Sequence, residues 1–124
     1  MPPRSGFLFV TDFPKARSEL VGNLLKRGYV SKPEVAAALR KVPREEFVPS
    51  GLRGEAYVDT PLPIGSGQTI SAPHMVAMMS EALDLRPGHK VLEVGGGSGY
   101  HAAVAAEIVS PGGRVFPVER IEEL

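Results

Sequence analysis

The chain contains no cysteine, and this absence removes several kinds of chemistry at once. Disulfide frameworks, thiolate zinc sites and thiol nucleophiles all need that residue. Net charge is absent as well, because 14 Lys and Arg residues balance 14 Asp and Glu residues. A chain without a basic excess lacks the field that general binding to nucleic-acid phosphates requires. We therefore expect no nucleic-acid partner.

Long apolar runs are also missing. Stretches such as Gly6–Val10 and Ala102–Ala106 fall far short of the roughly 18 apolar residues that a membrane span needs. The apolar residues that follow Arg4 end at Thr11, which is too early for the apolar part of a secretory signal. We therefore expect no membrane association and a cytoplasmic location. The oligomeric state stays open, and no His, Asp or Glu spacing suggests a metal site.

What is present has the composition of an ordinary globular protein. Of the 124 residues, 43% are hydrophobic and 23% are charged, values that argue against intrinsic disorder. The chain divides into three regions by local pattern. Residues 1–48 form an N-terminal helical region, residues 49–73 form a loop rich in proline and glycine, and residues 74–124 have an α/β pattern. We interpret the three together as one incomplete domain.

The N-terminal region predicts two helices. Asp12 is suited to cap the first helix, and Gly28 is suited to end it. Ser31 and Glu34 have the spacing of a capping box for a second helix, which Pro43 would end. This pattern is typical of a helical pair joined by a short connection.

The loop of residues 49–73 is too long to be structureless in a compact domain unless it has a function. Tyr57–Val58 and Gln68–Ile70 are candidates for short strands within it. Just before the loop, Glu45 and Glu46 predict a solvent-exposed face. The loop is thus the first candidate for a functional segment.

The last region predicts a β-α-β unit. A helix is expected from about Pro73 to Leu85, followed by a strand at Lys90–Val94. A glycine-rich turn at Gly95–Gly99 then leads into a helix at Tyr100–Val109, and a second strand covers Arg114–Val118. Two strands joined through a helix are expected to pair in parallel. The fold class is therefore α/β.

The glycine-rich turn is a candidate ligand site. Glycines between a buried strand and a helix permit a tight turn and let backbone N–H groups approach a ligand. The dinucleotide fingerprint needs a glycine where Tyr100 stands, and a phosphate-binding P-loop needs a lysine that this turn lacks. The observed pattern is G-x-G-x-G, at Gly95, Gly97 and Gly99.

Two acidic residues flank this turn. Glu93 lies two positions before the first glycine, and Glu119 ends the next strand. A carboxylate at the second position can accept hydrogen bonds from both ribose hydroxyls of a nucleoside cofactor, whether S-adenosylmethionine or NAD. The complete pattern resembles motif I of the class I S-adenosylmethionine-dependent methyltransferases. The resemblance implies a Rossmann-like fold and S-adenosyl-L-methionine as cofactor.

A second motif narrows the resemblance. The run Gly67–Pro73 reads Gly-Gln-Thr-Ile-Ser-Ala-Pro and precedes an apolar helix and the glycine turn. The run Val42–Pro49 and the final residues Val118–Leu124 agree with it. Over roughly Leu20–Leu124 the chain is similar to the protein-L-isoaspartate O-methyltransferases. The resemblance implies that the methyl group passes to the α-carboxylate of L-isoaspartyl residues in damaged proteins and peptides, as a repair reaction.

The same resemblance implies roles for individual residues. Ser71 occupies the position of the family's active-site serine. It is also a candidate N-cap for the helix that begins at Pro73, whose first-turn N–H groups are suited to hold a carboxylate. The residues that the resemblance implies for cofactor binding are Thr69, Glu93, Gly95, Gly96, Gly97, Ser98, Gly99 and Glu119.

The family's fold is a doubly wound, seven-stranded sheet, and this chain stops after the second strand of that sheet. We therefore expect a truncated Rossmann-like fold preceded by helices, with weak cofactor binding and little turnover by this chain alone. Three alternatives stay open. They are an inactive remnant that serves as a binding or assembly module, a fragment of an NAD-linked oxidoreductase, and a methyltransferase for another acceptor.

Overall fold

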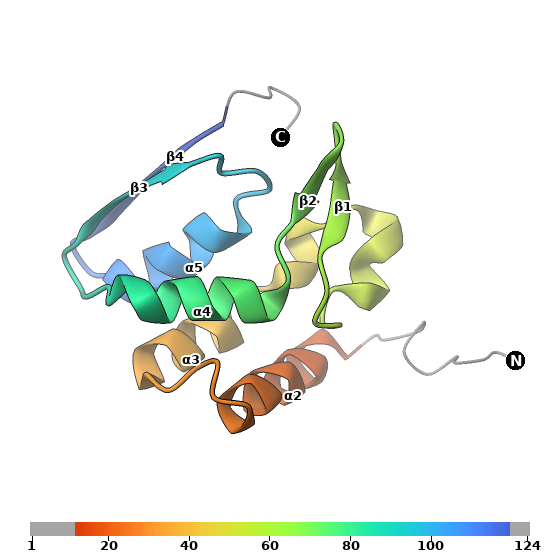
Figure 1. The fold of residues 1–124 in the computed structure, drawn as a ribbon, viewed down its shortest axis with the longest axis horizontal. Coiled ribbons are helices and arrows are strands. Elements are labelled where there is room, and N and C mark those ends of the chain that lie inside the picture. Colours follow the sequence, from red (N-terminus) through yellow and green to blue (C-terminus); the bar gives the residue numbers. More distant parts are fainter. Residues whose placement is uncertain (1–11, 120–124) are drawn as a thin grey trace, which may run out of the picture.

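The computed structural model describes residues 12–119, and the expectations for residues 1–11 and 120–124 lie outside this range. The described part combines helices with two small sheets (Figure 1). In chain order its elements are α2 (Phe13–Lys26), α3 (Pro33–Lys41), the 3-10 helices η1 (Arg44–Phe47) and η2 (Ser50–Glu55), β1 (Leu62–Gly65), β2 (Gln68–Ile70), α4 (Pro73–Leu83), β3 (Lys90–Val94), α5 (Tyr100–Val109) and β4 (Arg114–Val118).

Helix α2 begins and ends where its sequence predicts. The Asp12 side chain accepts a hydrogen bond from the Lys15 backbone N–H at 3.1 Å, which satisfies a donor that the helix cannot. After the helix, Gly28 adopts a φ of +82°, a conformation that favours glycine. Both ends of α2 are therefore set by local sequence.

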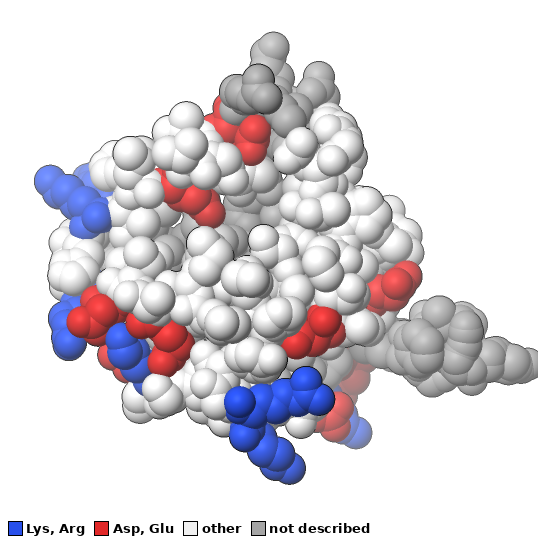
Figure 2. Space-filling view, in the orientation of Figure 1, with Lys and Arg blue, Asp and Glu red and all other residues white. Residues whose placement is uncertain are grey.

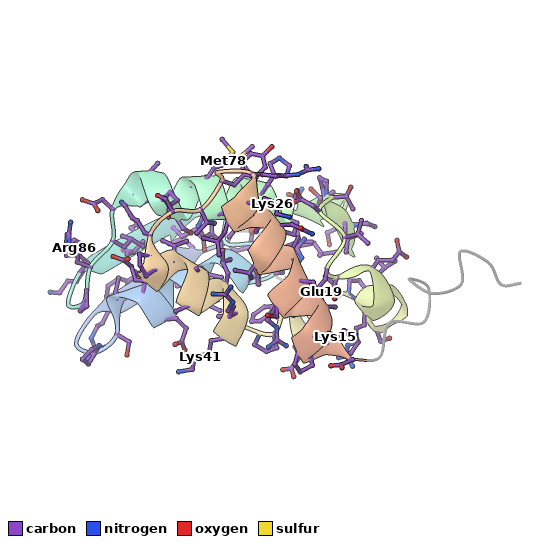
Figure 3. All side chains as sticks on the ribbon, turned by 90° about the horizontal axis from the view of Figure 1, so that it is seen from below. Lys15, Glu19, Lys26, Lys41, Met78 and Arg86 are labelled. Carbon is purple, nitrogen blue, oxygen red and sulfur yellow. The ribbon has the colours of Figure 1, made fainter. Side chains whose placement is uncertain are left out.

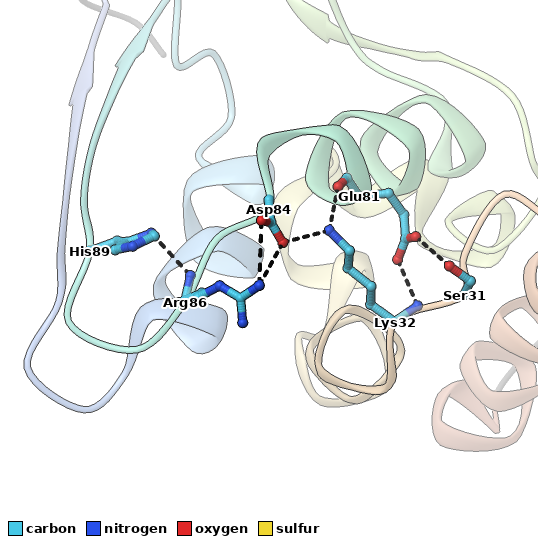
Figure 4. Close-up of polar contacts among 6 residues, drawn as sticks. All are labelled: Ser31, Lys32, Glu81, Asp84, Arg86 and His89. Carbon is cyan, nitrogen blue, oxygen red and sulfur yellow. Dashed lines mark hydrogen bonds and ion pairs between the residues drawn. The ribbon is translucent and has the colours of Figure 1, made fainter.

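The start of α3 corrects the predicted capping box. Lys32 is the N-cap residue of α3, and no side chain caps the helix from within its own segment. The Ser31 hydroxyl instead donates to the Glu81 carboxylate of α4, at 2.8 Å (Figure 4). The capping-box prediction is wrong because a distant carboxylate replaces the local one.

Glu81 and Lys32 join the N-terminal end of α3 to the C-terminal end of α4 (Figure 4). Glu81 accepts from the Lys32 backbone N–H at 2.9 Å, and the Lys32 ammonium donates to the Glu81 carbonyl at 2.9 Å and to Asp84 at 2.8 Å. Each helix end thereby receives the charge that opposes its dipole. The contact fixes how the two helices lie against each other.

The loop of residues 49–73 contains a hairpin. Strand β1 pairs antiparallel with β2, so that Leu62 faces Ile70. Ser66 and Gly67 connect the strands with φ of 52° and 70°, as a tight hairpin turn requires. The predicted strand at Gln68–Ile70 is confirmed, but the one at Tyr57–Val58 is wrong, because those residues form a turn.

The β-α-β unit follows the prediction closely. Strands β3 and β4 pair in parallel, from Lys90 opposite Arg114 to Val94 opposite Val118, with α5 between them in the chain. The predicted bounds of both strands and of α5 are confirmed. The core joins this unit to α2 and α3, and its buried apolar residues include Val21, Leu24, Val35, Leu39, Val104, Ile108 and Val109.

One face of the β3–β4 sheet is apolar and exposed. Leu92 and Val94 are 68% and 81% exposed, and Phe116 and Val118 beside them are about half exposed. On α4, Met78 also projects from the surface (Figure 3). The face seen in Figure 2 is accordingly mostly uncharged, with charged side chains chiefly near its margin. Among residues 12–119, no helix has both the length and the apolarity to cross a bilayer.

We predict that Glu81→Gln reduces stability in a pH-dependent way. Burial alone would raise the pKa of Glu81, but hydrogen bonds from Lys32 and Ser31 hold it below its ordinary value. A lowered folded-state pKa stabilises the fold above the unfolded-state pKa, and this contribution is lost as pH falls. Replacing this partly exposed charge should cost roughly 1 kcal/mol at pH 7.

Urea unfolding between pH 7 and pH 3 measures the effect. The difference between wild type and Glu81→Gln should shrink as the pH falls. Glu46→Gln is the matched control, since that exposed residue should leave the pH dependence unchanged. Parallel curves for wild type and Glu81→Gln would contradict the prediction.

Candidate active site

A cavity of about 370 Å³ lies where β2 and α4 meet the C-terminal end of β3 and the start of α5. It has apolar walls from the helices and strands, and polar groups at its glycine-turn end. Most of the residues predicted from the sequence contribute to it. The predicted residues that line it are Thr69, Ser71, Glu93, Gly95, Gly96, Gly97 and Ser98. Gly99 and Glu119 are outside the lining.

The turn after β3 needs glycine at alternate positions. Gly95, Gly97 and Gly99 have φ of +77°, +58° and +90°, values that residues with a side chain rarely adopt. Gly96 between them is crowded, since an added Cβ would lie 3.1 Å from the Cβ of Pro117. The G-x-G-x-G pattern is therefore a requirement of the backbone, whatever the turn binds.

The backbone amides of this turn are directed toward β4. The N–H groups of Gly95 and Gly96 donate to the Val118 carbonyl at 2.7 and 3.0 Å. The Gly97 N–H donates to the Glu119 carboxylate at 2.8 Å. The expectation that these amides present themselves to a ligand is wrong, because the end of β4 satisfies them. Three successive residues of the turn, Gly95 to Gly97, offer a surface without side chains, and the Glu119 carboxylate is bonded to the last of them.

Glu93 brings a partly buried carboxylate to the cavity wall. Its Oε1 atom is buried and has no hydrogen-bond partner among the described residues, and burial raises the pKa of Glu93. Its Oε2 atom lies 3.9 Å from Nδ1 of His101, and Nε2 of His101 is 3.2 Å from the Ser80 hydroxyl. Burial lowers the pKa of His101, so the imidazole is neutral near pH 7.

Sequence reasoning missed His101 and Ser80. They stand on α5 and α4, 21 positions apart, and no local spacing relates them to each other. Both helices pack on the same cavity, so the contact depends on tertiary structure alone. In the part of the chain that the structure describes, no group of three or more His, Asp or Glu residues is arranged to hold a metal ion.

Ser71 follows β2 and is exposed. The prediction that it caps α4 is wrong, because Ala72 occupies the N-cap position and no cap side chain bonds the helix. Asp59 satisfies the helix instead, accepting from the His74 backbone N–H at 2.8 Å and lying 2.9 Å from Nδ1 of His74. That backbone N–H is therefore already satisfied, and the Ser71 hydroxyl is not needed for capping.

A partly buried polar network joins α2, η1 and Tyr57. Glu45 is 8% exposed, so the expectation that it belongs to a solvated face is wrong, whereas Glu46 is exposed. Glu45 forms an ion pair with Arg17 at 3.3 Å and accepts from the Tyr57 hydroxyl. That hydroxyl accepts from Arg17 Nε at 2.7 Å and from the Arg44 backbone N–H at 2.9 Å.

The β-α-β unit, its glycine turn and the acid that follows β4 have the arrangement of the first two strands of a Rossmann-like class I methyltransferase. A family model described as protein-L-isoaspartate(D-aspartate) O-methyltransferase matches residues 15–124. The chain belongs to this family.

Two relatives illustrate the likeness, and both are named protein-L-isoaspartate O-methyltransferase. The protein of Methanopyrus kandleri is 68% identical over 112 residues, which cover 90% of this chain and 50% of the relative. The protein of Ignicoccus hospitalis is 66% identical over 108 residues, with 87% and 51% covered. The chain thus spans about half the length of the curated relatives it matches.

A solved structure agrees with the sequence relatives. It is described as a protein-L-isoaspartate O-methyltransferase from Plasmodium falciparum in complex with S-adenosyl-L-homocysteine. The two chains align with a TM-score of 0.77 at 32% identity, covering 87% of this chain and 50% of that one. The described fold is therefore the fold of this family over the matched part.

We predict that Tyr57→Phe is destabilising. Loss of the hydroxyl leaves the Arg17 Nε and the Arg44 backbone N–H without this acceptor, and it leaves the buried Glu45 carboxylate with Arg17 alone. An unsatisfied buried polar group costs about 1–3 kcal/mol, so the free energy of unfolding should fall by about 2 kcal/mol. Tyr29→Phe is the control, because the Tyr29 ring packs against His74 and that packing is kept. Equal chemical-unfolding midpoints for the two variants would show that the Tyr57 hydroxyl network does not contribute to the stability of the fold.

Proposed function

We propose that this protein transfers the methyl group of S-adenosyl-L-methionine to the α-carboxylate of L-isoaspartyl residues in damaged proteins and peptides. The observation that carries the proposal is the common cavity: Ser71, the glycine turn and the partly buried Glu93 carboxylate all line it. Family membership and the relatives' names support the same reaction. The activity belongs to the whole protein, and this chain spans half the length of its relatives.

The residues around the cavity suit an S-adenosyl cofactor. The buried Oε1 atom of Glu93 lacks a hydrogen-bond donor among the described residues, and a donor on a cationic ligand would satisfy it. The glycines of the turn permit close approach, and we assign the Glu119 carboxylate, which is bonded to Gly97, to the ribose hydroxyls. Thr69 and Ser98 add hydroxyls to the lining. When bound, S-adenosylmethionine supplies an electrophilic methyl group on a sulfonium.

The acceptor side needs positioning more than acid–base catalysis. A carboxylate has a reference pKa of about 4, so the acceptor is ionised and nucleophilic at neutral pH. Correct placement of the reacting groups can be worth roughly 7–11 kcal/mol of barrier. The Ser71 hydroxyl, which no cap interaction engages, is suited to donate to one carboxylate oxygen. We therefore assign Ser71 the role of holding the acceptor in line.

Each of the three regions defined from the sequence has its own role in the proposed reaction. In this proposal residues 74–124 are the cofactor unit and residues 49–73 are the acceptor loop. The described part of residues 1–48 contacts that loop through Arg17 and Arg44. Isoaspartyl proteins and peptides are the partners in this proposal, and a cytoplasmic location stays a prediction. No observation favours the NAD-linked or the non-catalytic alternative.

The test uses two peptides that differ only in an isoaspartyl or a normal aspartyl linkage. We predict that the protein transfers labelled methyl from S-adenosylmethionine to the isoaspartyl peptide alone. Ser71→Ala should lower the rate by about 10- to 100-fold, as expected for one lost hydrogen bond to a charged group. Ser18→Ala, at an exposed position on α2, should leave the rate unchanged.

Two results would contradict the proposal. Equal labelling of both peptides would mean that the acceptor is not the isoaspartyl carboxylate. A folded protein that binds S-adenosylhomocysteine but labels neither peptide would favour a non-catalytic binding module.

A further inference from the structure

Arg44 is the largest fully buried side chain in the described part of the chain, with 0% exposure. It follows Pro43 on the short helix η1. Burying a cation is costly unless its donors are satisfied. No described carboxylate forms an ion pair with Arg44, and its neighbour Glu45 is paired with Arg17. An ion pair therefore does not explain why Arg44 is buried.

The guanidinium donates to backbone carbonyls from two parts of the active-site loop. Its Nε donates to the Ala56 carbonyl at 2.8 Å, and its Nη2 donates to the Ser71 carbonyl at 3.0 Å. Its Nη1 is buried without a partner among the described residues. The buried Arg44 side chain therefore holds the backbone of Ser71 directly.

The same guanidinium also packs on the cofactor unit. Its central carbon lies 4.9 Å from the ring centroid of Tyr100, which is the first residue of α5 and directly follows the glycine turn. Phe47 packs on the same ring at 5.6 Å between centroids. One rigid group thus contacts both the Ser71 backbone and the residue that ends the turn.

We propose that Arg44 is a positioning residue for methyl transfer, which sets the distance between Ser71 and the glycine turn. The inference rests on the proposed function, because it assigns the acceptor to Ser71 and the cofactor to the turn. In-line transfer is sensitive to displacement, and an error of about 1 Å can cost a hundredfold in rate. The planar fork of Arg serves two carbonyls and a ring together, which a lysine ammonium cannot do.

The experiment compares Arg44→Met and Arg44→Lys with Arg17→Met, each made in the full-length protein. Arg17 belongs to the same buried network through Tyr57 and Glu45, but no described contact joins it to Ser71 or Tyr100. It therefore controls for loss of stability without loss of positioning. Methylation of the isoaspartyl peptide is measured at a temperature where circular dichroism shows each variant to be folded.

We expect Arg44→Met to lower kcat at least tenfold, with the KM values for peptide and cofactor changed less than threefold. Arg44→Lys should fall between it and wild type, and it covers the case in which the Met variant does not fold. Arg17→Met should keep kcat within threefold of wild type. Wild-type kcat in Arg44→Lys, or equal losses in Arg44→Met and Arg17→Met, would overturn the inference.

Amide hydrogen exchange separates this inference from the proposed function. If wild type methylates nothing, the proposed function fails, and exchange then decides the role of Arg44. The Arg44 variants should exchange faster at Val76 in the first turn of α4 and at Ala103 in the first turn of α5. Both amides are bonded to the start of their helices in the native fold. Unchanged exchange at either one would overturn the inference.

Discussion

The end of β4 holds the glycine turn, and the candidate site depends on that contact. The Val118 carbonyl and the Glu119 carboxylate accept from three successive amides of the turn. Because β3 and β4 pair in parallel, with Val94 opposite Val118, the turn that follows β3 lies beside the residues at the end of β4. The turn therefore keeps its shape without a ligand, and a ligand meets a preformed surface. Preorganisation of this kind reduces the ordering that binding would otherwise require.

A second set of contacts supports the acceptor loop. The Tyr57 hydroxyl joins Arg17 to Glu45, and Arg44 links the loop carbonyls to the aromatic ring that follows the turn. These groups are buried or partly buried, and a half-satisfied polar network is costly. The contacts of Arg44 consequently favour one arrangement of the Ser71 backbone over the alternatives. The acceptor and cofactor sides of the cavity are thus connected by side chains that do not line it.

Local features of the sequence were enough to predict α2, β2, β3, α5 and β4, because apolar periodicity, caps and glycine turns act over a few residues. Three of the wrong predictions have a common cause, which is a contact with a residue that is distant in the sequence. Ser31 bonds to Glu81, 50 positions away, and Glu45 is buried by Arg17 and Tyr57. Asp59 caps α4 in place of Ser71. Each of these three errors arose where a distant partner replaced a local one, and no spacing in the sequence shows such a partner.

The central claim is that the turn between β3 and α5 forms part of a binding surface for an S-adenosyl group. Titration with S-adenosyl-L-homocysteine, followed by the amide spectrum of the protein, tests it most directly. Saturable shifts should concentrate at Gly95–Ser98 and Thr69, and NAD at the same concentrations should produce none there. Shifts that avoid the turn, or equal shifts with NAD, would contradict the account.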